Sequence, residues 1–122
     1  MADFDFEIND ITRAGVSVTY NQDPDGTALT LSTTDDFYFL NDGRTFLHVA
    51  NGATAGEITF ETVGTVDGLA IADRTETVEA SSEQFFGPFP TGDYNDPATR
   101  TVHVTFATPT TIEVAVLRLL AA

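Results

Sequence analysis

Apolar and polar side chains alternate with a period of two residues in several stretches of the chain. At 58–61, apolar Ile58 and Phe60 alternate with polar Thr59 and Glu61. The same pattern recurs at 16–20, 101–106 and 112–116. Because successive side chains of a β-strand point to opposite faces, such alternation is typical of half-buried strands. No window repeats its apolar residues at the period of a helix, so the chain is predicted to be almost entirely β.

Clusters of Gly, Asn, Asp and Pro separate these stretches and mark turns. They lie at 23–26, 41–43, 51–52, 67–68, 92–93 and 95–97. The Asn41-Asp42-Gly43 cluster, between apolar stretches at 37–40 and 45–49, is the clearest hairpin signal, because such turns need the positive φ that Gly supplies. One short helical turn is expected over residues 67–73.

The number and spacing of these stretches predict roughly eight or nine short strands in an all-β fold. We expect an antiparallel β-sandwich, either jelly-roll-like or closed into a small barrel. No linker or low-complexity tract divides the 122 residues, so residues 1–122 are expected to form a single domain. Residues 1–10 can serve as an N-terminal arm on a neighbour, with Phe4, Phe6 and Ile8 as an alternating apolar stripe.

The charge of the chain is strongly one-sided. Asp and Glu number 19 against five basic residues, all of them Arg, which gives a net charge of −14. Nucleic-acid and anionic-membrane binders need clustered Lys or Arg, so the composition excludes both partner classes. The acidic N-terminal segment lacks the positive charge of a signal peptide, so synthesis in the cytoplasm without export is expected.

The acid excess also indicates a salt-rich environment. A surface this negative repels itself, and at molar salt the Debye length falls to about 3 Å, which removes most of that repulsion. We therefore favour a halophilic origin over an ordinary acidic mesophilic domain. The absence of Cys excludes disulfides and thiolate metal sites.

The residues that could carry chemistry are few. His48 and His103 are the only histidines, no Ser has the surroundings of an activated nucleophile, and the two histidines bind a metal only if the fold brings them together. Asp23 and Asp25 resemble the start of a calcium loop, but further ligands do not follow at the required spacing, so an ordinary turn is favoured. We expect no catalytic residues, no cofactor and no enzyme activity.

Apolar segments and arginines are the candidates for protein–protein contact. The Phe-rich loop at 85–90 either closes one end of the sandwich or forms an exposed anchor. The tail at 116–120 is apolar on both sides, as in a strand covered on both faces or pressed against a neighbouring subunit. Arginines are expected to pair with acids, within the chain or between subunits. The candidate interface residues are Phe4, Phe6, Ile8, Arg44, Phe85, Phe86, Phe89, Leu117, Arg118 and Leu119.

Residues 41–119 contain short pieces that mark turns and strand ends. They read NDGRTFL at 41–47, NG at 51–52, GTVDGLA at 64–70, DRT at 73–75, GPFP at 87–90, YN at 94–95 and VAVLRL at 114–119. In these pieces the chain resembles small β-rich virion structural proteins encoded in the head-gene clusters of tailed viruses. The acidic, lysine-free composition adds the expectation of a haloarchaeal tailed virus.

This resemblance implies a head decoration or minor capsid protein on the capsid surface. Its partners would be further copies of itself, as a trimer or pentamer, and the major capsid protein or other virion proteins. A neck, head–tail connector or tail component of the same virion is the alternative. A carbohydrate- or cell-surface-binding β-module is a second one, although a chain without Trp and with three Tyr offers little for stacking on sugars.

Overall fold

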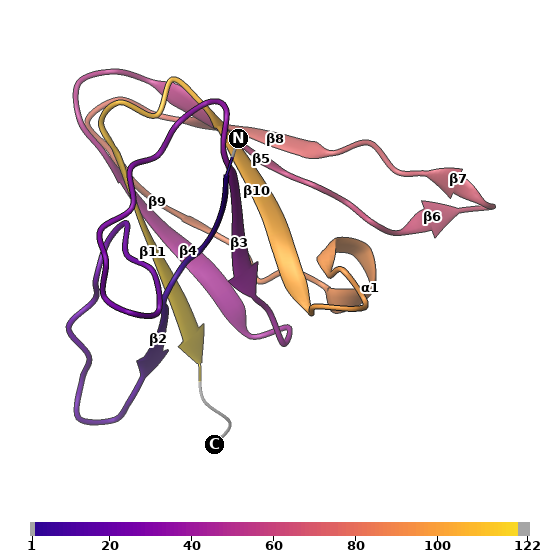
Figure 1. Ribbon diagram of the computed structural model, residues 1–122, viewed down its shortest axis with the longest axis horizontal. Coiled ribbons are helices and arrows are strands. Elements are labelled where there is room, and N and C mark those ends of the chain that lie inside the picture. The colour runs from indigo at the N-terminus through magenta and orange to yellow at the C-terminus, as the bar shows by residue number, and fades with distance from the viewer. Residues whose placement is uncertain (1, 120–122) are drawn as a thin grey trace.

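The computed structural model describes residues 2–119, apart from the side chain of Val66, and shows two β-sheets packed face to face (Figure 1). The first sheet has the strand order β1–β3–β10–β5–β8. Its strands are β1 (Asp3–Asp5), β3 (Asp36–Leu40), β10 (Thr101–Ala107), β5 (Gly56–Phe60) and β8 (Arg74–Val78).

The second sheet has the order β2–β11–β4–β9. Its strands are β2 (Ile8–Ile11), β11 (Ile112–Leu119), β4 (Thr45–Asn51) and β9 (Glu83–Phe86). A separate two-stranded ribbon consists of β6 (Thr65–Val66) and β7 (Leu69–Ala70), and one short helix, α1 (Thr91–Tyr94), precedes β10.

Consecutive strands lie in opposite sheets, except β5 and β8, which pair with each other and are joined through β6 and β7. The two four-stranded sets β3–β10–β5–β8 and β2–β11–β4–β9 therefore have the strand order of a jelly roll, to which β1 adds a fifth strand at one edge. The predicted all-β sandwich of about nine strands is confirmed.

The prediction of purely antiparallel pairing is wrong at the two N-terminal strands. β1 pairs with β3 in parallel, and β2 pairs with β11 in parallel. Parallel neighbours need a connection of about a dozen residues or more, and the long segment 12–35 between β2 and β3 provides one. The alternating stretch at 16–20 lies in this segment and forms no strand.

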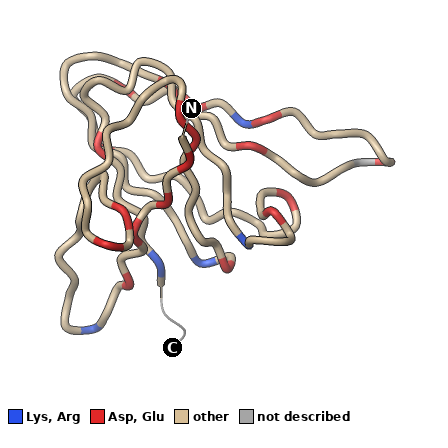
Figure 2. Tube along the Cα trace, in the orientation of Figure 1, with Lys and Arg blue, Asp and Glu red and all other residues tan. Residues whose placement is uncertain are grey.

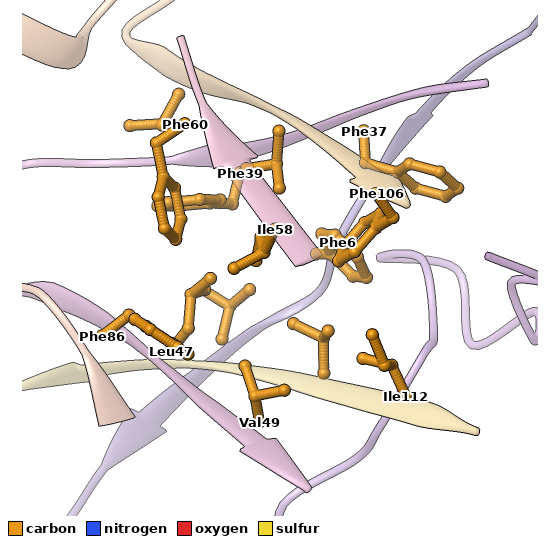
Figure 3. Packing of buried hydrophobic residues seen from close by; sticks show 14 of the residues in the cluster. Phe6, Phe37, Phe39, Leu47, Val49, Ile58, Phe60, Phe86, Phe106 and Ile112 are labelled. Carbon is orange, nitrogen blue, oxygen red and sulfur yellow. The ribbon is translucent and has the colours of Figure 1, made fainter. Parts of the chain in front are cut away.

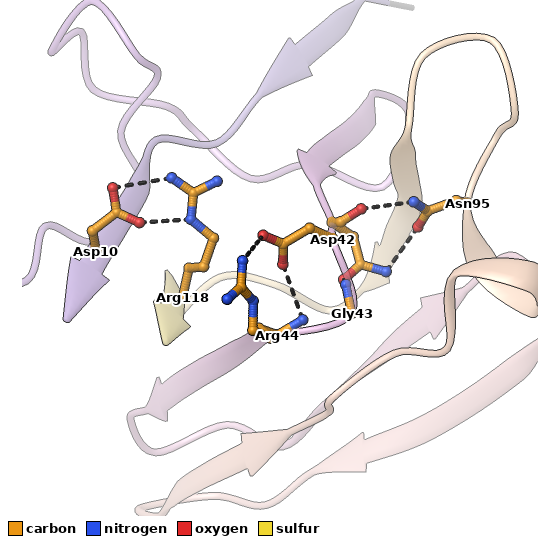
Figure 4. Close-up of polar contacts among 7 residues, drawn as sticks. Asp10, Asp42, Gly43, Arg44, Asn95 and Arg118 are labelled. Atoms are coloured by element: carbon orange, nitrogen blue, oxygen red, sulfur yellow. Dashed lines mark hydrogen bonds and ion pairs between the residues drawn. The ribbon is translucent and has the colours of Figure 1, made fainter. Parts of the chain in front are cut away.

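The expected hairpin at Asn41–Gly43 is a corner between the sheets, because β3 lies in the first sheet and β4 in the second. The Asn41 amide donates to the Phe89 carbonyl. It also donates to the Asn95 side chain, and the Asn95 amide donates back to the Asn41 carbonyl (Figure 4). These bonds satisfy the polar groups of Asn41, which is buried at the start of the turn. Gly43 has the positive φ of 90° that its turn requires.

The expected helical turn at 67–73 is also wrong. Asp67 and Gly68 have φ values of 52° and 79° and form the two-residue turn of the β6–β7 ribbon. Two positive φ values in succession are typical of a type I′ turn, whose twist suits a β-hairpin. The helix is instead α1, within the irregular stretch after β9.

The core lies between the two sheets and consists of the inward-facing residues of both (Figure 3). Phe37 and Phe39 of β3 and Ile58 and Phe60 of β5 face Leu47 and Val49 of β4, and all six are fully buried. The alternation at 58–61 therefore predicts the buried face of β5 correctly, with Ile58 and Phe60 inward and Glu61 exposed. This filled core leaves functional groups to the outer faces, edges and loops.

Candidate functional site

Four of the ten candidate interface residues are buried within the chain itself. Phe6, Phe86 and Phe89 belong to the core cluster. In the Phe-rich segment 85–90, Phe86 and Phe89 therefore close one end of the sandwich. Leu117 is buried on the outer face of the second sheet, between its cross-strand neighbours Phe46 and Asn9. None of these four side chains is a surface anchor, which corrects that expectation for each of them.

The expected N-terminal arm is part of the domain. Residues 3–5 and 8–11 are strands of the two sheets, and Phe6 between them enters the core. Phe4 and Ile8 pack against the core and are partly buried. Phe4 and Phe6 stack on Phe37 with ring centroids 5.6 Å apart in both cases. Burying its apolar stripe ties this segment to its own sandwich.

Three of the five arginines pair with acids of the same chain. Arg118 on β11 makes a two-point contact with Asp10 on β2, with Nε–Oδ1 and Nη2–Oδ2 distances of 2.6 and 3.0 Å (Figure 4). This contact lowers the pKa of Asp10 and fixes two neighbouring strand ends to each other. Arg74 pairs with Glu76 at 3.3 Å, and Arg44 with Asp42 at 3.2 Å. Of the two open alternatives, pairing within the chain holds for these three.

Two candidates, Phe85 and Leu119, lie on the outer face of the second sheet. Phe85 on the edge strand β9 is 67% exposed and stacks on the His48 ring at a centroid distance of 4.8 Å. Phe46 lies beside it, 6.1 Å away between ring centroids. Leu119, at the end of β11, is 51% exposed and donates its N–H to the Arg44 carbonyl. Arg44 lies in the turn before β4, where its guanidinium pairs with Asp42. We call Phe46, Phe85 and Leu119 the aromatic patch.

The polar border of the aromatic patch is held in place by His48. Its Nδ1 lies 2.8 Å from the Tyr20 hydroxyl, and its Nε2 lies 3.1 Å from the Glu83 carboxylate. Desolvation, followed by the nearby negative charge of Glu83, raises the pKa of Tyr20. With both ring nitrogens engaged, the imidazole is a fixed platform for the Phe85 ring.

Residues 61–73, which connect β5 to β8, project from the sandwich as a narrow ribbon that we call the arm (Figure 1). Leu69 near its tip is 72% exposed, and Val63 nearer the base is also exposed. Asp67 at the tip is the only charged residue between positions 62 and 72 (Figure 2). The arm is therefore an apolar projection on a strongly acidic protein.

The base of the arm is held by hydrogen bonds to the body of the protein. The N–H groups of Val63 and Gly64 donate to the Asp93 carbonyl in α1, at 2.7 and 3.3 Å. The Asp73 carboxylate accepts from the Thr62 N–H at 3.0 Å, which joins the two strands where the arm leaves the sheet. These bonds set the direction of the arm. The arm could not be predicted from the sequence, because alternation indicates a strand but not whether other residues cover it.

The two histidines are not brought together. His48 lies on β4 in the second sheet and His103 on β10 in the first, each on the outer face. Within residues 2–119, no group of three His, Asp or Glu side chains is placed to hold a metal ion. Asp23 makes an ordinary turn, since one of its carboxylate oxygens accepts the N–H groups of Asp25 and Thr27.

His103 is the centre of an acidic cluster on the first sheet. Its Nε2 lies 2.8 Å from Asp36, its Nδ1 contacts Glu61, and its ring stacks on Tyr38 at 4.9 Å. Desolvation lowers the pKa of His103, but the hydrogen bonds to Glu61 and Asp36 outweigh it, so the net pKa is raised. Carboxylates on both nitrogens favour the doubly protonated ring, which offsets charge on this face.

An open groove of about 640 Å³ runs beside β1 at the same edge of the first sheet. Its lining combines the carboxylates of Asp3, Asp5 and Asp96 with the Tyr38 ring and the apolar side chain of Leu40. The groove offers acceptors and one aromatic ring, and it contains no nucleophile–base pair among the residues that line it.

The comparisons with known proteins add no relative. The chain matches no protein-family model, no curated protein and no solved structure. Within residues 2–119, no helix has the length and apolar character to cross a bilayer.

Proposed function

We propose that this protein is a structural subunit of a virus particle, which decorates or stabilises the head of a tailed virus through protein–protein contacts. The observation that carries the proposal is the pair of exposed apolar surfaces, the arm and the aromatic patch, on a domain whose core is already complete. Exposed clusters of this kind usually mark interfaces. The motif resemblance at 41–119 supplies the virion setting.

The charge distribution supports contact through these two surfaces. The net charge of −14 makes most of the surface repel other acidic proteins, whereas residues 62–72 of the arm carry one charge, on Asp67. Aromatic side chains lose little entropy on binding, so Phe46 and Phe85 suit an interface centre. The partners we propose are further copies of this chain, as a trimer or pentamer, and the major capsid protein.

The jelly-roll order supports the proposal only weakly, because this architecture serves viral capsid proteins and lectins alike. The lysine-free, acidic composition supports assembly in concentrated salt, as in a virus of a halophilic archaeon. We propose no enzyme activity. The features that favour contact are surface features, and the groove beside β1 presents acceptors without an activated nucleophile.

Quantitative mass spectrometry tests the proposal on density-purified particles of the virus that encodes this chain. A head decoration protein is expected in copy numbers comparable with those of the main shell subunit. A neck or tail component, the first alternative, would be present in a single small ring per particle. Absence from purified particles would contradict both.

The groove beside β1 favours a second candidate function, a carbohydrate- or cell-surface-binding module. Carboxylates from Asp3, Asp5 and Asp96 beside the Tyr38 ring combine acceptors for sugar hydroxyls with one stacking surface. A glycan array in molar NaCl distinguishes the two, with Tyr38→Ala as the matched variant. Binding that is lost with this variant, together with absence from particles, would favour the carbohydrate-binding module.

A further inference from the structure

We propose that a hollow at the base of the arm binds a carboxylate of a partner protein, an Asp or Glu beside an aliphatic residue, through Arg100. The hollow has a volume of about 540 Å³ and lies between the turn at Asn41 and Asp42, α1, and Val63 at the start of the arm. The inference rests on the proposed function for the identity of the partner, another virion protein. It names the chemistry of one contact, which can also be tested without particles.

The Arg100 side chain is a cation without an acidic partner in its own chain. The ion pairs that arginines make within residues 2–119 use Arg44, Arg74 and Arg118, and none of them uses Arg100. Arg100 is exposed and lines the hollow. A guanidinium presents five N–H donors in a planar fork that matches the two oxygens of a carboxylate. Arg100 therefore offers a two-point contact to an incoming carboxylate.

The backbone holds Arg100 in a conformation that an arginine rarely adopts. Its φ is 59°, in the left-handed region that favours Gly or Asn. The Arg100 N–H donates to the Asp96 carbonyl at 2.7 Å, and the Arg100 carbonyl accepts from the Asn41 N–H at 3.0 Å. Because Gly would suit this turn better, the local fold does not explain an arginine here. Strained residues of this kind cluster at functional positions.

Two further groups in the hollow suit a carboxylate that has an apolar neighbour. The Asn95 amide has two N–H donors, and its bond to the Asn41 carbonyl uses one of them (Figure 4). Val63 is 40% exposed and supplies an apolar surface on the same lining. An aliphatic side chain next to the bound carboxylate would cover Val63 and remove this apolar surface from water.

The acids that line the hollow are already engaged. The Asp42 carboxylate pairs with Arg44 at 3.2 Å, and the Asp96 carboxylate accepts the Ala98 N–H at 2.8 Å. In molar salt the Debye length is about 3 Å, so repulsion from the rest of the chain is screened and an acidic partner can approach. The groove beside β1 is different, because its lining has three carboxylates and no cation. Of these two hollows, the one at Arg100 suits a carboxylate.

NMR of the purified full chain, labelled with ¹⁵N and kept in molar NaCl, tests the site with isovalerate, which joins a carboxylate to a branched apolar group. Isovalerate should shift the Arg100 Nε–H signal saturably, and the neutral isovaleramide should not. The Arg13 Nε–H signal is the internal control, because Arg13 is exposed on the segment after β2. No saturable shift at Arg100, or an equal shift with isovaleramide, would overturn the inference. A tighter response to inorganic phosphate would also overturn it, because the hollow would then be a phosphate site.

Variants of Arg100 separate binding from folding. Arg100→Gly should weaken isovalerate binding about tenfold or more, because it removes hydrogen bonds to a charged group. Its melting temperature should equal or exceed that of the wild type, because Gly adopts a positive φ readily. Arg100→Lys keeps the charge but loses the fork, so it should weaken binding severalfold. Arg13→Gly is the matched control and should leave binding unchanged. Full binding by Arg100→Gly, or a lower melting temperature for it, would overturn the assignment.

Particles of a virus from which the gene for this chain is deleted distinguish this inference from the proposed function. The wild-type chain is expected to bind these particles in molar NaCl, and Arg100→Gly should bind about tenfold more weakly or not at all. Equal binding of the two chains would overturn the contact and leave the proposed function standing. Isovalerate binding at Arg100 by a chain that does not bind particles would remove the proposed function and keep the carboxylate site.

Discussion

Phe85 lies on β9, Phe89 follows four residues later in the loop after this strand, and the structure gives them opposite roles. Phe89 is 0% exposed, and its ring packs against Phe60, Tyr94 and Phe39 at centroid distances of 4.8, 5.3 and 5.5 Å. Phe85 lies on the outer face of the second sheet. Substituting each by Ala therefore compares a buried core Phe with an exposed Phe in one protein.

The expected decrease in the free energy of unfolding for Phe89→Ala follows from the burial of its side chain. An aromatic side chain buries roughly 150–250 Å², which at about 25 cal/mol per Å² corresponds to about 4–6 kcal/mol. Buried Phe→Ala substitutions typically cost about 3–5 kcal/mol, because a cavity remains. We therefore expect Phe89→Ala to lower the free energy of unfolding by about 3–5 kcal/mol. Phe85→Ala should change it by about 0.5 kcal/mol or less in the monomer.

Urea unfolding followed by circular dichroism, in molar NaCl and at low protein concentration, measures both values. Low concentration keeps any oligomer from adding its own stability to the monomer's. Two equally small losses would refute the assignment of Phe89 to the core, as would a larger loss for Phe85→Ala than for Phe89→Ala.

Three further predictions concern Thr45, His103 and the net charge. Thr45 is fully buried, and its hydroxyl has no hydrogen-bond partner within residues 2–119, so Thr45→Val should raise the free energy of unfolding by about 1 kcal/mol in the same assay. His103 has a raised pKa in the folded state, so its contribution to stability is fully present below the unfolded pKa of about 6.5 and is lost as the pH rises through the folded pKa. Melting curves against pH should therefore show the advantage of wild type over His103→Gln shrinking at higher pH, and an advantage that grows there would contradict the assignment. The melting temperature should rise steeply from dilute buffer to molar NaCl, because screening removes self-repulsion, and a flat profile would refute the halophilic interpretation.

The strands and their buried faces could be predicted from sequence because alternation is a local signal. Ile58 and Phe60 point inward and Glu61 outward, as the period of two requires. Pairing is not local. Asn41–Gly43 has the turn chemistry of a hairpin, but the same residues serve a corner that sends Phe37 and Leu47 to opposite walls of one core.

Exposure of apolar residues could not be predicted in the same way. Phe85 and Phe86 are identical neighbours that point to opposite faces of β9, and only the fold decides that the face of Phe86 is covered and that of Phe85 is exposed. The arm was missed for a related reason, since an apolar residue such as Leu69 normally predicts a covered strand. The composition indicated an interface, and the fold was needed to say where its apolar residues lie.

A cryo-electron microscopy map of the purified particle examines the proposed assembly most directly. The proposal predicts copies of the two-sheet domain on the head, with the arm or the aromatic patch of each copy in contact with another virion protein. A head surface without this domain, or copies whose arm and aromatic patch both face solvent, would contradict it.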